Sequence, residues 1–221
     1  SMGFRLSRWD EKLLEYTNLY DDRSEVPVES LLFEKKVLDT AYRSLDGKIK
    51  SALQIAHDRV RLYHEKQLEA SGAGLSWSYE DDQGNILGQF VRGMERVGIY
   101  VPGGKAAYPS TVIMTAIPAR VAGVKEIILC VPAPRGVVSK TVLAAAHLCK
   151  VDKVFSIGGA QAIAALAFGT GLVSKVDKIV GPGNIYVAKA KEKLNWEPEV
   201  KFEELVEMMV RADCEKFGVP L

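Results

Sequence analysis

From residue 97 onward the sequence alternates four times between a short apolar run and a longer, alanine-rich segment. The runs are rich in β-branched residues, each is closed by Gly or Pro, and they occupy residues 97–101, 126–131, 153–157 and 176–180. The intervening segments have the length of helices and occupy residues 110–122, 139–149, 160–168 and 185–194. This alternation predicts right-handed βαβ units, in which a parallel sheet carries helices on both faces. We therefore expect an α/β protein with a Rossmann-like sheet.

The residues before this sheet show two other patterns. Apolar side chains recur at three- and four-residue spacing between residues 4 and 72, and Gly72 ends the pattern. Such spacing predicts amphipathic helices. Two short runs then flank the turn cluster 81–85, which predicts a β-hairpin. The expected organisation is an N-terminal helical region (1–72), a β-hairpin connection (73–96), the Rossmann-like domain (97–194) and a C-terminal helical tail (195–221).

The charge balance excludes several classes of function. The 221 residues carry 29 Lys and Arg against 28 Asp and Glu, a formal net charge of +1, whereas nucleic-acid-binding surfaces need a positive excess. No apolar run reaches the roughly 18 residues of a membrane-spanning helix. Charged residues such as Arg5 and Arg8 stand where a signal peptide would be apolar. The three cysteines are widely spaced, as in a reducing compartment. The sequence predicts a cytoplasmic protein without nucleic-acid or membrane partners.

Three glycine-containing loops stand at the carboxyl ends of predicted strands. They are Tyr100-Val-Pro-Gly-Gly-Lys105, Ser156-Ile-Gly-Gly-Ala-Gln161 and Gly181-Pro-Gly-Asn184. Ligands of open α/β sheets bind outside these ends, where glycine lets the backbone approach the ligand. Helix N-termini there favour anions such as a pyrophosphate. The layout alone predicts a nucleotide or phosphate site. The alternative is that the glycines only make tight turns.

The same loops carry a resemblance to the histidinol dehydrogenase family. It rests on Glu95-Arg-Val-Gly-Ile-Tyr-Val-Pro-Gly-Gly, Ile157-Gly-Gly-Ala-Gln-Ala-Ile-Ala-Ala-Leu-Ala and Val176-Asp-Lys-Ile-Val-Gly-Pro-Gly-Asn-Ile-Tyr-Val-Ala. The resemblance runs from about residue 9 to residue 194 and covers the N-terminal half of the family. Members oxidise L-histidinol to L-histidine in two NAD-dependent steps of histidine biosynthesis, with a zinc ion holding the substrate. Histidinol dehydrogenases dimerise, so a homodimer is also implied, although largely through parts missing here.

The resemblance implies that Tyr100, Gln161 and Asn184 contact NAD. Each residue suits that role: Tyr100 offers a ring and a hydroxyl at a strand end, Gln161 opens a helix after two glycines, and Asn184 follows Gly-Pro-Gly. The alternative for Tyr100 is plain packing, and for Asn184 it is helix capping. Because other parts of the family's site are missing, we expect the NAD site to be weak or partial.

The family's catalytic and zinc-binding residues follow the Gly-Pro-Gly-Asn loop, and this sequence has no match for them. Its three histidines, His57, His64 and His147, all precede that loop. His57 and His64 have no cysteine or histidine partner at zinc-ligand spacing. His147 is interpreted as a surface or core histidine and not as a ligand, and Cys130 as a small buried hydrophobe. We therefore expect neither a metal site nor catalytic residues in this chain, and no oxidation of histidinol by the isolated chain.

Residues 195–217 resemble the C-terminal end of GDP-mannose 4,6-dehydratases, through Asn-Trp-Glu-Pro and Phe-Glu-Glu-Leu-Val. This resemblance implies a tail of foreign origin, whose helix over 203–217 would pack on the α/β domain or on a second copy. Three interpretations follow. The chain is a catalytically incomplete NAD-binding fragment, an engineered or rearranged chimeric scaffold without ligand binding, or a dehydrogenase completed by a partner chain.

Overall fold

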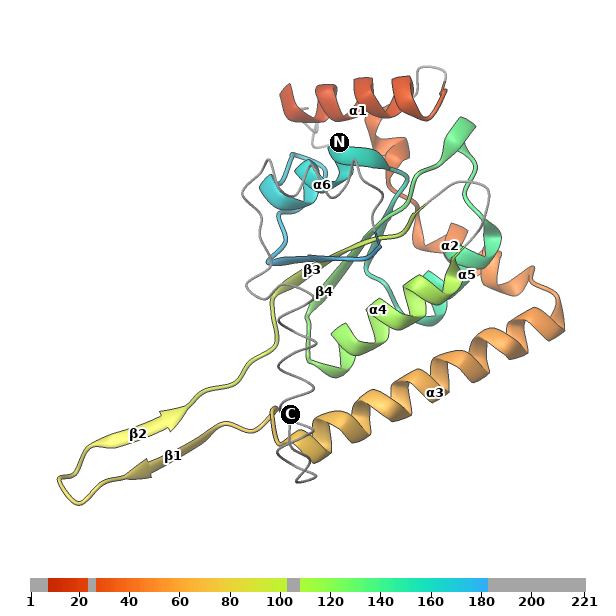
Figure 1. Ribbon diagram of the computed structural model, residues 1–221. Coiled ribbons are helices and arrows are strands. Elements are labelled where there is room, and N and C mark those ends of the chain that lie inside the picture. The colour runs from red at the N-terminus through yellow and green to blue at the C-terminus, as the bar shows by residue number, and fades with distance from the viewer. Residues whose placement is uncertain (1–7, 24–26, 103–107, 183–221) are drawn as a thin grey trace, which may run out of the picture.

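The computed structural model describes residues 8–23, 27–102 and 108–182. Its centre is a parallel sheet of four strands (Figure 1), namely β3 (Arg96–Tyr100), β4 (Glu126–Cys130), β5 (Lys153–Phe155) and β6 (Lys178–Val180). The strand order is β5-β4-β3-β6, and every neighbouring pair is parallel. The predicted strands are thus confirmed, although β5 and β6 are shorter than the apolar runs that predicted them.

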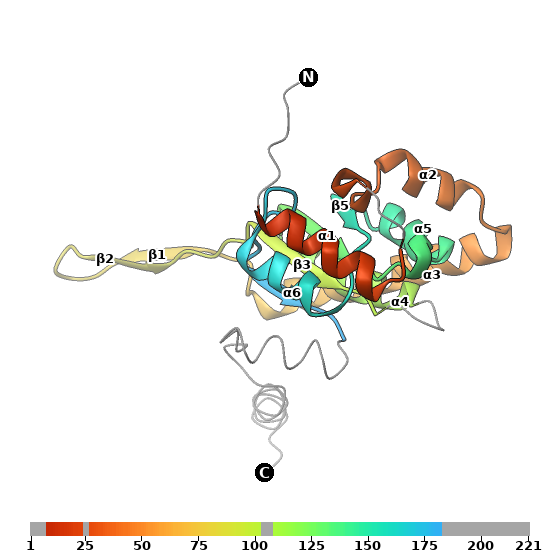
Figure 2. The same ribbon diagram turned by 90° about the horizontal axis from the view of Figure 1, so that it is seen from above.

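Helices cover both faces of this sheet, as the alternation predicts. The helices after β3 and β4, which are α4 (Pro109–Val121) and α5 (Lys140–Leu148), lie on one face. The helix after β5, α6 (Gly159–Phe168), lies on the opposite face, as the view from above shows (Figure 2). The chain changes face because β6 pairs with the free side of β3 instead of continuing beyond β5.

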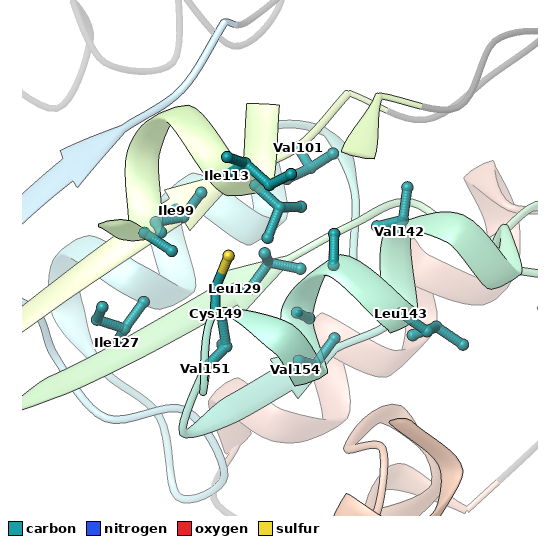
Figure 3. Packing of buried hydrophobic residues seen from close by; sticks show 14 of the residues in the cluster. Ile99, Val101, Ile113, Ile127, Leu129, Val142, Leu143, Cys149, Val151 and Val154 are labelled. Atoms are coloured by element: carbon teal, nitrogen blue, oxygen red, sulfur yellow. The ribbon is translucent and has the colours of Figure 1, made fainter. Parts of the chain in front are cut away.

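Alternating side chains of the strands build a core on each face. Ile99, Ile127 and Leu129 are fully buried against α4 and α5 (Figure 3). Ile128 and Cys130, the intervening residues of β4, are fully buried in the cluster around α6. Strands that are buried on both faces read as nearly continuous apolar runs. This is why the sequence pattern of the sheet was recognisable.

The N-terminal helices pack onto the same two faces. They are α1 (Arg8–Tyr20), α2 (Lys35–Arg43) and α3 (Gly47–Ser71), with a 3₁₀ turn at Val28–Leu31 and another, after β4, at Pro134–Gly136. The first helix contacts α6, whereas α2 and α3 contact α5 and α4. The side chain of Asp46 caps α3 by accepting a hydrogen bond from the Lys48 N–H. Gly72 ends the helix at a left-handed φ of 63°, as expected from the sequence.

The predicted β-hairpin is also present. β1 (Trp77–Glu80) pairs antiparallel with β2 (Ile86–Gln89), and the pair projects away from the sheet (Figure 1). The predicted helices at 185–194 and 203–217 lie outside the described residues. Among the residues that are described, no helix is long and apolar enough to cross a membrane.

Candidate functional site

The candidate site is the carboxyl edge of the sheet where β3 and β6 meet. The helices after β3 and β5 cover opposite faces of the sheet, and β6 pairs with the side of β3 that β4 leaves free, so the strand order reverses at this edge. Ligands of doubly wound sheets bind at such a reversal. The two strand ends approach closely, since a Cβ atom on Gly181 would lie 2.0 Å from the Tyr100 carbonyl oxygen. Gly181 also has a φ of 127°, which L side chains rarely adopt. Glycine is therefore required where β6 ends.

Tyr100 ends β3 with its ring inside the protein. Only 3% of the residue is exposed, and the ring belongs to the buried cluster beneath α6. Its hydroxyl oxygen accepts a hydrogen bond of 3.2 Å from the backbone N–H of Gly159. Burial raises the pKa of the Tyr100 hydroxyl, so the phenol is neutral at physiological pH. The Tyr100 ring thus packs in the core, which was the alternative to NAD contact in the sequence analysis. Its hydroxyl reaches the first turn of α6.

Gln161 lies in that same first turn, two residues beyond Gly159. Its side chain folds back over the turn, because a Cβ atom on Gly159 would lie 2.6 Å from its Oε1 atom. Gln161 also lines a groove of about 490 Å³ between α1 and α6. Four aromatic residues of this groove are exposed, namely Trp9, Tyr16, Tyr20 and Phe168. The structure thus brings Tyr100 and Gln161 to one turn. Asn184, the third predicted contact, lies outside the described residues.

The groove keeps its shape through a buried carboxylate on α1. Asp10 is fully buried, and its two carboxylate oxygens accept hydrogen bonds of 3.0 Å from the N–H groups of Gly171 and Leu172. These residues follow α6 in the chain. Asp10 therefore fixes α1 against the loop after α6 and sets the position of both walls of the groove.

A second buried group holds two neighbouring strand-end loops. Arg23 donates from Nε to the Ala133 carbonyl oxygen at 3.1 Å, and from Nη2 and Nη1 to the carbonyl and Oγ of Ser156, at 3.0 and 3.2 Å. Asp21, with one oxygen 3.8 Å from Arg23 Nη2, accepts the Ala133 N–H at 3.1 Å. Burial raises the pKa of the Asp21 carboxyl and lowers that of the Arg23 guanidinium. Together they tie the N-terminal segment to the ends of β4 and β5.

Sequence reasoning missed Asp10, Asp21 and Arg23. All three stand in or beside a helical pattern, where charged residues ordinarily face solvent. The partners of Arg23 lie 110 and 133 positions away along the chain. A short Asp-Asp-Arg run between two amphipathic segments is the only local signal, and it does not point to those partners.

Each of the three histidines contacts a neighbouring side chain. His57 contacts the Asp58 carboxylate and His64 contacts the Gln67 side chain, both on exposed parts of α3. His147 stacks on Tyr42, with ring centroids 5.2 Å apart. The described part of the chain contains no group of three His, Cys, Asp or Glu side chains that could hold a metal ion. The residues that the structure describes therefore do not fit the zinc ion that the family resemblance implies.

Comparisons with known proteins agree on one family. A family model described as histidinol dehydrogenase matches residues 7–215. Histidinol dehydrogenase from Psychrobacter arcticus is 55% identical over 182 residues, which cover 82% of this chain and 41% of that protein. The protein of the same name from Neisseria gonorrhoeae is 51% identical over 187 residues, or 85% of this chain and 42% of that protein.

A solved structure gives the same result for the fold. The crystal structure of histidinol dehydrogenase from Elizabethkingia anophelis superimposes with a TM-score of 0.75 at 33% identity, covering 85% of this chain and 42% of that one. The chain thus spans about two fifths of the length of the relatives it matches. The family match runs to residue 215 and so includes most of the expected foreign tail. The similarity of residues 195–217 to GDP-mannose 4,6-dehydratases is therefore not supported, and neither is a chimeric origin.

Proposed function

Because the chain belongs to the histidinol dehydrogenase family, we propose that it is the segment that binds NAD at the carboxyl edge between β3 and β6. The observation that carries this proposal is the first turn of α6, where the Tyr100 hydroxyl and the Gln161 side chain both lie close to Gly159. This turn is near the end of β3, where the strand order of the sheet reverses. Dinucleotides bind at such switch points in other doubly wound sheets.

In this proposal each residue has a different role in binding NAD. Gln161 is the hydrogen-bonding group, since its amide offers both a donor and an acceptor to a ribose or an amide. Tyr100 holds the turn at Gly159 in place, and its hydroxyl is the atom that reaches the ligand. Asn184, which follows Gly-Pro-Gly in the sequence, is the third NAD contact in this proposal. The backbone N–H groups at the start of α6 suit the negative charge of a pyrophosphate.

When bound, NAD supplies the hydride acceptor for the oxidation of histidinol in this family. The contribution of this chain is to bind and orient the dinucleotide. The zinc ion and the proton-transfer groups belong to other positions in the family, so the oxidation of L-histidinol to L-histidine is proposed for the full-length enzyme and not for this segment alone. Binding by the segment is correspondingly weak, because losing about 3 kcal/mol of contacts weakens affinity roughly a hundredfold.

The test is a titration of the isotope-labelled chain with NAD, followed by amide chemical shifts. We expect the shifts to move at residues 158–161, and Gln161→Ala to weaken binding at least tenfold. Gln83→Ala is the matched control, since Gln83 lies in the exposed turn of the hairpin and should leave binding unchanged. The proposed site would be contradicted by saturable NAD binding whose affinity is unchanged in Gln161→Ala. It would also be contradicted by chemical-shift changes confined to residues on other surfaces.

A further inference from the structure

The groove between α1 and α6 exposes aromatic rings on two helices that lie side by side (Figure 2). On α1, Trp9, Tyr16 and Tyr20 share one stripe, because they are seven and four residues apart. On α6, Phe168 comes from the last turn of the helix, and it is 64% exposed. Apolar surface gathered in one groove marks an interaction site.

This groove has little charge and a fixed shape. Among the described residues that line it, Lys12 is the charged one, and its ammonium is paired with the Glu15 carboxylate. The carboxylate of Asp10 holds α1 on the loop after α6 through two backbone N–H groups. Ala160 and Ala164 have small side chains, which leave the space between the helices open. An amphipathic helix is the ligand that binds in a preformed apolar groove of this kind.

The C-terminal part of the sequence contains an amphipathic segment of matching length. Its apolar residues stand at positions i, i+3, i+4, i+7 and i+8, namely Phe202, Leu205, Val206, Met209 and Val210. A helix over the 15 residues 203–217 would be about 22 Å long, and the 13 residues of α1 span about 20 Å. An isolated helix of this length is marginally stable in water, so it needs a surface on which to pack.

We propose that residues 203–217 form a helix that docks in the groove between α1 and α6, with its apolar stripe against the exposed rings. The chain leaves the sheet close to this groove. Gly181 approaches the carbonyl group of Tyr100, whose hydroxyl accepts a hydrogen bond from Gly159 at the start of α6. The 20 residues from 183 to 202 can span roughly 70 Å when extended, which is ample for the segment to reach the groove.

Other exposed apolar surfaces of the described residues fit this segment less well. The hairpin of β1 and β2 offers strand edges, which pair with another strand and not with a helix. On α3, the charged Arg59 lies between the exposed Ile55 and Leu62 on the same face. A segment joined to the groove by 20 residues is also present at a high effective concentration, which favours docking within one chain over exchange between two copies.

The test uses the full chain with a nitroxide label on Cys214, which stands in the docking segment. Cys130 and Cys149 are buried, and burial raises the pKa of each thiol to about 12, so the label is directed to Cys214. We expect the nitroxide to reduce amide signal intensities in α1 and α6 at least twofold, relative to the same sample after reduction with ascorbate. Amide signals of the hairpin residues 77–80 and 86–89 should keep their intensity.

Substitutions in the segment test the stripe. Leu205→Ser plus Met209→Ser should abolish the loss of intensity in α1 and α6, because both side chains belong to the apolar stripe. Glu204→Ser plus Arg211→Ser is the matched control. These two residues lie on the opposite side of the same predicted helix, so the loss of intensity should remain.

Substitutions in the groove test the receiving surface. Tyr20→Ser plus Phe168→Ser should also abolish the effect of the nitroxide, and the fold should persist because both side chains are exposed. The control is Met114→Ser plus Val137→Ser, which alters residues that are 65% and 71% exposed and do not line the groove. That pair should leave the intensities as they are in the wild type.

A mixed sample separates docking within one chain from exchange between two copies. Isotope-labelled chains without nitroxide are mixed with unlabelled chains that carry it, and we expect no loss of intensity. A loss would show that a second copy supplies the helix, which overturns the proposal. It is equally overturned if the labelled full chain shows no effect in α1 and α6, or if either control pair abolishes the effect as fully as its test pair. None of these outcomes depends on whether NAD binds.

Discussion

Arg23 donates two hydrogen bonds to Ser156, one to the carbonyl oxygen at 3.0 Å and one to Oγ at 3.2 Å, across 133 positions of the chain. The pair links the segment after α1 to the residue that follows β5, immediately before the turn that carries Gly159 and Gln161. The arrangement of this edge of the sheet therefore depends on a residue far from the glycine loops.

Replacing Arg23 with leucine should destabilise the fold strongly. The change leaves the Asp21 carboxylate buried without its cation, and breaking a buried ion pair from one side costs about 3–5 kcal/mol. Urea unfolding followed by circular dichroism measures the loss. Arg43→Leu is the control, because its ion pair with Asp39 is on the surface with the Arg43 side chain 78% exposed, and such pairs contribute about 0–1 kcal/mol. Equal effects of the two changes would show that the Arg23 contacts are not stabilising.

Tyr100→Phe should loosen the turn at the start of α6 without emptying the core. The ring is retained, but the Gly159 N–H loses its acceptor, which costs about 1 kcal/mol. The expected results are a modest fall in unfolding free energy and faster hydrogen exchange at Gly159, with weaker NAD binding wherever binding is measurable. Tyr79→Phe, in the exposed hairpin, serves as the control. A Tyr100→Phe variant with unchanged exchange at Gly159 would argue against this role for the hydroxyl.

Stability should depend on the ionisation of Glu126. Its carboxylate lies 2.8 Å from Lys153 Nζ and 2.7 Å from Arg96 Nε, and these contacts, Lys153 foremost, lower its pKa from 4.5. A carboxyl whose pKa is lower in the folded state stabilises the fold above its unfolded pKa, and the contribution disappears as pH falls through the folded value. Glu126→Gln should thus be less stable than wild type at pH 7.

The matching measurement is the unfolding free energy of both proteins at pH 7 and at pH 3. The difference between wild type and Glu126→Gln should shrink at the lower pH. Glu65→Gln removes an exposed helical ion pair with Arg61 and should show a smaller difference at pH 7. A Glu126→Gln effect that is the same at both pH values would have to come from packing and not from charge.

The isolated chain should bind no stoichiometric zinc and should not oxidise histidinol. The described residues hold no cluster of metal-ligating side chains, and His57, His64 and His147 are too far apart in sequence and too differently placed to substitute for one. Elemental analysis after dialysis, and absorbance of NADH in the presence of histidinol, NAD and zinc, are the measurements. One zinc per chain, or NADH formation that a chelator abolishes, would refute the prediction.

Cys130 and Cys149 should resist alkylation in the native protein. Both are buried, and burial raises the pKa of each thiol to about 12, so the reactive thiolate is scarce at pH 8. Peptide mass spectrometry after iodoacetamide treatment should find both thiols unmodified, and modified once urea is added. Rapid labelling of either residue without denaturant would mean that the core of the sheet opens readily.

Local sequence patterns were sufficient to predict the strands, the hairpin and the end of α3. Each depends on a few neighbouring residues, such as the alternation around Ile99 or the break at Gly72. Burial of the Tyr100 ring was an open alternative, since a residue at a strand end can face either a ligand or the core. The strand order was beyond prediction, because the pairing of β3 with β6 is decided by packing between residues about eighty positions apart.

The candidate site could be predicted from the sequence only in part. The glycines that turn the chain are local signals, and the sequence identified the loop that contains Gln161. The groups that hold this loop in place, Arg23 and Asp21, become visible only when the chain is folded. Their charge is unremarkable in the sequence, and their significance comes from burial, which no run of neighbouring residues encodes.

The contact between Asp10 and the backbone of Gly171 and Leu172 also constrains the order of events during synthesis. These partners are separated by 161 and 162 positions, and translation at 5–20 residues per second needs roughly 10–30 s to cover that interval. During this time α1 has been made while the loop that receives it has not. The helix α1 therefore cannot reach its native place until residues 171 and 172 have been made, so it docks late although it is made early.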